Sequence, residues 1–237
     1  MKRSRANPLI AVVNRSNNVL TDYQIIRMIP ALQRQLTEHF QPAWGLTAQI
    51  IYAERDIPKD AYQVVIYDKP GDEGDAGYLG YHFTNNGFPI ASIFALDDMR
   101  DDGTISDTLS HEILEMLVDP AVNLYAYRPG HGSRPARGYF YEVCDPVQCV
   151  KYEIDGILVT NFVYPEWYEF IWPEGSRKFD HMGSLTKPFQ VLKDCYADIY
   201  EERRGDEGGF KTIWGSGQGA HKKRHRMKSR IQTRGLL

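Results

Sequence analysis

The sequence predicts an α+β fold, in which a mixed sheet with helices is followed by a part rich in β-hairpins. Two turn signals favour this class, because an Asn-Gly pair at 86–87 and an Asp-Gly pair at 155–156 each separate two short strand-like runs. A third observation is that the strand-like runs alternate with helical periodicity, first over residues 25–36 and later around His111. The sequence therefore predicts a sheet with helices in the first half of the chain and hairpins in the second half.

The first half, residues 9–120, is predicted to run as strand, helix, strands, hairpin and helix. Thr21 or Asp22 can cap the first helix, and Thr104 or Asp107 can cap the second. Runs of apolar, β-branched and aromatic residues place the strands at 9–13, 47–53, 63–67, 78–84 and 90–95.

The second half, residues 121–204, is predicted to complete a single domain that spans residues 1–204. It should contain a surface loop at 127–138, a strand at 138–144, the Asp-Gly hairpin and a last helix that starts at Pro188. Residues 205–237 are predicted to be a flexible glycine-rich linker and a basic tail.

Composition limits the classes of protein that fit. Of the 237 residues, 42% are hydrophobic and 25% are charged, which is ordinary for a globular protein. No apolar run reaches the length of a membrane span, so no membrane partner is expected. The sequence lacks a secretory pattern, which predicts a cytoplasmic protein or one packaged in a virion. The three cysteines are expected to be reduced thiols.

Charge is unevenly distributed along the chain. Residues 221–237 hold seven Lys and Arg and no acidic residue, while the preceding residues carry 21 basic and 31 acidic side chains. Residues 221–234 are therefore a candidate contact for an anionic partner, either nucleic acid or an acidic protein. The alternative is a solvated, disordered tail.

The segment Ser-His-Glu-Ile-Leu-Glu-Met-Leu-Val-Asp-Pro at 110–120 contains the candidate active site. On a helix, His111 and Glu115 lie on one face and can bind one metal ion together. Glu112 follows the histidine and can act as general base on a metal-activated water. The alternative is that these residues form the polar side of an amphipathic helix.

This segment resembles the active-site helix of zincin-like metallopeptidases, with Glu115 in place of their second histidine. The resemblance covers residues 9–120 and implies a zincin-like mixed sheet, a metal ion and peptide hydrolysis with Glu112 as the catalytic base. The chain also resembles, more weakly, uncharacterised proteins of tailed bacteriophages and bacterial genomes.

The third metal ligand has three candidates. Glu142 ranks first, because strand alternation places it beside Cys144 on one face of a strand. Asp119 follows, since Pro120 should turn the chain back there, and Asp145 is third. One divalent ion is expected, with zinc as first choice and manganese, iron or calcium as alternatives in so anionic a site.

Two functions follow from these patterns. The first is a metal-dependent hydrolase, most simply a peptidase that acts on a peptide or protein substrate, with Tyr141 or His82 near the oxyanion. For His82, the simpler prediction is a partly exposed strand residue. The second is a non-enzymatic structural or assembly protein, such as a virion component, that keeps a zincin-like fold.

Overall fold

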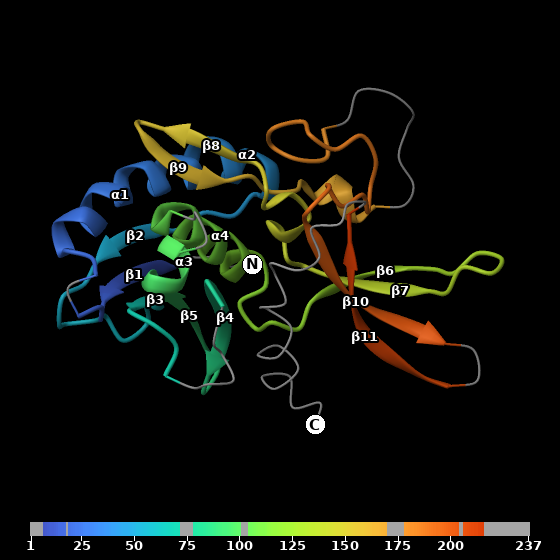
Figure 1. Cartoon of the computed structure of the whole chain (residues 1–237), viewed down its shortest axis with the longest axis horizontal. Helices are drawn as coiled ribbons and strands as arrows, with labels where there is room; N and C mark the ends of the chain where they lie inside the picture. The colour runs from blue at the N-terminus through green and yellow to red at the C-terminus, as the bar shows by residue number, and fades with distance from the viewer. Residues whose placement is uncertain are drawn as a thin grey trace, which may run out of the picture.

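The computed structural model confirms the α+β class, with helices and mixed sheets in one chain (Figure 1). The structure describes residues 7–17, 19–71, 78–100, 104–169, 178–203 and 206–215. The basic tail at 221–234 lies outside the described residues.

The first sheet has the strand order β2-β1-β3-β5-β4. Its first four strands run parallel, and β4 is antiparallel to β5 at the edge. The predicted hairpin between β4 and β5 is confirmed, because Asn86 and Gly87 both have the positive φ that this turn requires. The strands are β1 (Leu9–Asn14), β2 (Gln49–Tyr52), β3 (Tyr62–Tyr67), β4 (Gly80–Asn85) and β5 (Phe88–Phe94).

Both predicted helices are present, and each begins at a threonine. The side chain of Thr21 accepts the Gln24 N–H, and Thr104 forms the matching box with Asp107. The first helix continues as a π-helical turn and a further short helix. The helical elements of this half are α1 (Asp22–Arg34), η1 (Gln35–Phe40), α2 (Gln41–Trp44), α3 (Ala95–Arg100) and α4 (Ile105–Val118).

Helix α4 is enclosed on every side, since all 14 of its residues are buried. It packs against β3, β4 and β5 of the sheet and, elsewhere on its surface, against β9 (Ile157–Thr160). Leu109, Ile113 and Leu114 provide its apolar contacts in the main core. The alternative in which His111, Glu112 and Glu115 form the polar side of an amphipathic helix does not fit this burial, because these polar groups lie in the protein interior.

The second half forms an antiparallel sheet and a separate hairpin, to the right of and above the first sheet in Figure 1. The sheet has the order β11-β10-β7-β6, and the Asp-Gly hairpin pairs β8 with β9 as predicted. The remaining elements are β6 (Tyr125–Arg128), β7 (Arg137–Phe140), η3 (Asp145–Val147), β8 (Lys151–Ile154), η4 (Pro165–Tyr168), β10 (Tyr196–Arg203) and β11 (Asp206–Trp214).

Three predictions for the chain after residue 120 are wrong. The last helix is absent, because residues 196–203 form β10 between β7 and β11. The glycine-rich linker is in part strand β11, whereas the predicted loop is present between β6 and β7. Sheet pairing here overrides local sequence preference. The reduced-thiol prediction fails for two cysteines, since Cys149 and Cys195 form a disulfide.

A stack of rings joins η1 to the second half of the chain. The ring of His181 lies 4.6 Å from that of His39 and 5.2 Å from that of Phe162, measured between ring centres. The Tyr164 hydroxyl lies 3.4 Å from His181 Nδ1. Burial, with a smaller contribution from His39, lowers the pKa of His181 to about 4. The folded protein therefore holds this imidazole neutral.

Acid should weaken the fold through His181. The unfolded chain takes up this proton near pH 6.5 and the folded chain only near pH 4, so stability falls as the pH falls through that window. We expect a loss of roughly 1–2 kcal/mol, because part of the ring remains solvated. Urea unfolding at pH 7 and pH 5 should show a smaller loss in His181→Phe than in the wild-type chain. Equal losses in both proteins would show that another group causes the effect.

Candidate metal centre

Helix α4 brings the first two predicted ligands together. His111 Nε2 lies 3.0 Å from Glu115 Oε1, as expected for side chains one helical turn apart. His111 is 4% exposed and Glu115 is fully buried. The helix therefore holds an imidazole and a carboxylate side by side in the interior, where water solvates neither group well.

The segment after β7 brings further possible ligands to this side. Asp145 Oδ1 lies 3.2 Å from His111 Nε2, so His111 has a carboxylate oxygen on either side. The Cys144 N–H donates to Glu115 Oε1 over 3.2 Å and fixes the orientation of that carboxylate. The Cys144 thiol is buried, and its sulfur, His111 and Glu115 can place ligand atoms within 4.8 Å of one another. From the sequence, Cys144 is expected to be a reduced thiol, and it is not among the ligands predicted for the His111 site.

Strand β4 brings His82 close to two glutamates of α4. His82 Nδ1 lies 3.4 Å from Glu112 Oε2 and 3.9 Å from Glu115 Oε2. Its approach depends on Gly80, where an added Cβ would lie 3.2 Å from the Thr108 methyl group on α4 and 3.0 Å from the Ser92 carbonyl oxygen. The absence of a side chain at Gly80 therefore lets β4 lie close to α4.

His82 is 1% exposed, so the prediction of a partly exposed strand residue is wrong. The period-two pattern of β4 contained the missing signal, because Gly80 and His82 are its two buried positions. What the sequence alone did not reveal is that this face of β4 packs on α4.

The structure places Glu142 and Asp119, two candidates for the third ligand, in different surroundings. Glu142 is 2% exposed and belongs to a possible donor group with His82 and Glu115, although it follows β7 instead of lying within it. Asp119 is engaged elsewhere, because its carboxylate accepts the N–H groups of Asn123 and Leu124 at 3.0 and 2.9 Å. Asp119 therefore closes the C-terminal turn of α4 and belongs to neither donor group.

Tyr141, the predicted oxyanion partner, is stacked on another tyrosine. Its ring centre lies 4.3 Å from that of Tyr168. Burial, with a smaller contribution from Glu169, raises the pKa of the Tyr141 hydroxyl. Tyr141 is therefore held as a neutral phenol near the segment that carries Glu142.

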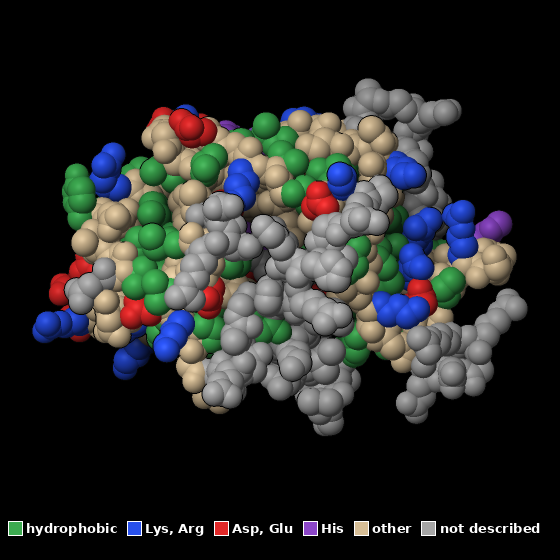
Figure 2. Space-filling model, viewed as in Figure 1, with side chains coloured by type: hydrophobic (Ala, Val, Ile, Leu, Met, Phe, Trp, Pro, Cys, Tyr) green, Lys and Arg blue, Asp and Glu red, His purple; other side chains and the backbone are tan. Residues whose placement is uncertain are grey.

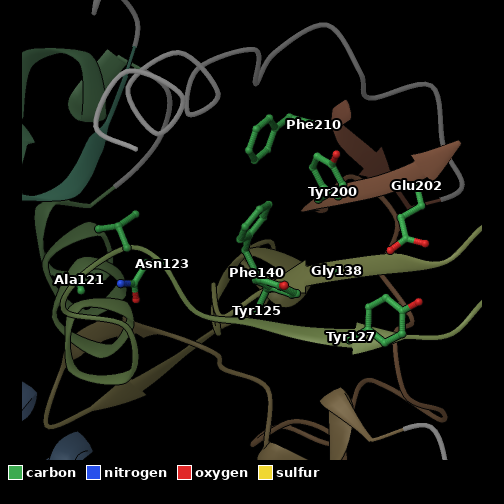
Figure 3. A pocket seen from close by; sticks show the side chains of 10 residues that line it. Ala121, Asn123, Tyr125, Tyr127, Gly138, Phe140, Tyr200, Glu202 and Phe210 are labelled. Atoms are coloured by element: carbon green, nitrogen blue, oxygen red, sulfur yellow. The ribbon is translucent and has the colours of Figure 1, made fainter. Parts of the chain in front are cut away.

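An aromatic cavity of about 580 Å³ lies beyond the C-terminal end of α4. The rings of Phe140 and Phe210 stack in its wall with their centres 5.7 Å apart, and Tyr200 lies on the adjoining strand (Figure 3). Asn123 and Glu202 add polar groups to the wall. Such a lining suits a ligand with apolar or planar groups.

A basic surface lies at the far end of the β6–β7 hairpin. Arg128, His131, Arg134 and Arg137 line a depression there. Figure 2 shows Lys and Arg side chains gathered on this right-hand part of the molecule. Arg137 is already paired with Glu201, with 2.9 Å between Nη2 and Oε2, so part of this positive charge is neutralised within the protein.

Comparisons with protein-family models, with curated proteins and with solved structures find no match to this chain. Among the described residues, none of the helices has the length and apolar character needed to cross a membrane. The buried cluster is therefore the feature of this chain that points to a function.

Proposed function

We propose that this chain is a metal-dependent hydrolase, most simply a peptidase, with the metal held between His111 and the carboxylates around it. The observation that carries the proposal is the position of His111 Nε2, which lies 3.0 Å from Glu115 Oε1 and 3.2 Å from Asp145 Oδ1. Nitrogen and oxygen ligands on one ion lie about 3–4 Å apart, and both distances from His111 Nε2 are close to that spacing.

The donor set fits a divalent cation. One histidine and two carboxylates can bind zinc, and they suit manganese or iron as well. Cys144 would shift the preference towards zinc if its thiolate replaced Asp145 as the third ligand. Such an ion supplies Lewis acidity and makes water acidic enough to attack at neutral pH.

Glu112 is proposed as the general base. It lies next to His111 on the helix and is fully buried, with its Oε2 3.4 Å from His82 Nδ1. A carboxylate oxygen in this position can accept a proton from the attacking water and later return it to the leaving group.

The position of β4 supports a peptide substrate. This strand is at the edge of the sheet and packs against α4, so an extended peptide that paired with β4 would run beside the helix. The same arrangement supports the zincin-like resemblance, in which a strand before the helix lies along the cleft.

Burial favours a second candidate function. With His111 only 4% exposed and Glu115 fully buried, the ion could serve structure alone in a non-enzymatic or assembly protein. A catalytic ion needs one open coordination position for substrate or water, while a structural ion has protein ligands at all positions. The two candidates therefore predict different results on metal removal.

Metal removal and restoration should separate the two functions. The purified chain is treated with a chelator and then resupplied with Zn²⁺ or Mn²⁺, and cleavage of a fluorescence-quenched peptide library is followed together with thermal unfolding. Hydrolysis should disappear with the metal and return with it. If the metal restores only the unfolding temperature and no peptide or ester is cleaved, the ion is structural and the hydrolase proposal is wrong.

A further inference from the structure

The two oxygens of Glu115 face two different groups of side chains. Its Oε1 lies 3.0 Å from His111 Nε2 and accepts the Cys144 N–H. Its Oε2 lies 3.9 Å from His82 Nδ1, on the β4 side of the helix. A carboxylate used in this way can bridge two cations, one on each oxygen.

A complete donor group exists on the β4 side. His82, Glu115 and Glu142 can each place one ligand atom within 4.8 Å of the other two. All three are at most 2% exposed. Contraction of about 1 Å on binding would bring these atoms to the spacing found around a single ion. This group is made from β4, α4 and the segment after β7, so the fold itself brings the three together.

The hydrogen bonding of His82 supports a second ion independently of the donor group. Within the described part of the chain, neither of its ring nitrogens makes a hydrogen bond. Its Nδ1 nevertheless lies 3.4 Å from one glutamate oxygen of α4 and 3.9 Å from another. A buried polar group left in this state is unfavourable, and coordination of a cation by the imidazole nitrogen removes that cost.

Charge also favours a second ion. Glu112, Glu115, Glu142 and Asp145 carry four negative charges when ionised, and all four are buried. One divalent ion offsets half of that charge and two offset all of it. Because burial of net charge in the protein interior is expensive, a second cation lowers the free energy of the ionised cluster.

We propose that the cluster binds two divalent cations bridged by the Glu115 carboxylate. The first lies among His111, Glu115 and Asp145, and the second lies among His82, Glu115 and Glu142. This inference rests on the proposed hydrolase function and makes it more specific. Paired cations stabilise both the attacking and the leaving oxygen, so amide, ester and phosphoester hydrolysis are the reaction classes that such a site serves.

The test counts ions in the full-length chain. After chelation, the protein is titrated with Mn²⁺ and washed, and its manganese content is measured per chain. We expect two equivalents in the wild type and one in both His82→Phe and Glu142→Gln. The matched control is Asp198→Asn, which removes a buried carboxylate of β10 that belongs to neither donor group and should retain two.

Electron paramagnetic resonance on the wild type gives a second measurement that needs no variant. Two ions bridged by one carboxylate should show an exchange-coupled signal, whereas ions bound separately at the surface show the sextet of isolated Mn²⁺. A wild-type content of one equivalent overturns the two-ion inference and leaves the hydrolase proposal standing. A content of zero overturns both. Two equivalents that persist in His82→Phe and Glu142→Gln, or that show no coupling, also overturn the inference.

Discussion

Glu112→Gln should lower turnover by about 10²–10⁴-fold while the metal content remains at the wild-type value. Glutamine has nearly the same shape but cannot accept the proton of the attacking water. Glu112 belongs to neither donor group. Its Oε2 lies 3.4 Å from His82 Nδ1. The measurements are kcat on the best substrate of the peptide screen and elemental analysis of the same preparation.

The matched control for this variant is Glu153→Gln, an exposed glutamate on β8 that should leave both quantities unchanged. Loss of a metal equivalent in Glu112→Gln would identify Glu112 as a ligand instead of the base. Unchanged turnover would remove it from the reaction altogether.

His111→Ala should lose one metal equivalent and all measurable hydrolysis. The imidazole is the only nitrogen ligand proposed for the first ion, and its removal leaves Glu115 and Asp145 with no nitrogen ligand between them. When the free ion concentration is a thousand times the dissociation constant, binding stabilises the fold by about 4 kcal/mol. For a chain of this length, that loss lowers the unfolding temperature by roughly 10 °C.

His131→Ala is the control, because His131 is exposed on the β6–β7 hairpin and belongs to neither donor group. The distances around His111 also suit a protonated imidazole shared by two carboxylates without any ion. Metal content distinguishes these states directly. A His111→Ala chain with the same metal content as the wild type would show that His111 is an ion-pair partner and not a ligand.

The local part of the site was predictable from sequence, and the long-range part was not. The i, i+4 spacing correctly placed His111 beside Glu115, because helix geometry fixes that relation. The hairpin turns at 86–87 and 155–156 were predictable for the same reason, since the turn residues determine them locally. Glu142 and Asp145 were both named as candidates for the third ligand; Asp145 lies beside His111, and Glu142 groups with His82 and Glu115.

The errors come from packing between distant segments. His82 seemed a surface residue because a single strand does not reveal what covers its face, and here α4 covers it. Asp119 was a candidate metal ligand, but its carboxylate accepts two backbone N–H groups of the turn that follows α4. The stretch after Pro188 has helical spacing, yet residues 196–203 form a strand because β7 and β11 provide partners on either side.

The enclosure of α4 has a consequence for the rate at which ions are exchanged. Each proposed ligand is almost completely shielded from solvent, and the ligands come from β4, α4 and the segment after β7. An ion inside can leave only when one of these segments separates from the helix. Metal release should therefore proceed at the rate of local opening, independent of chelator concentration once the chelator is abundant. The residence time of the ion would then report how often this part of the protein opens.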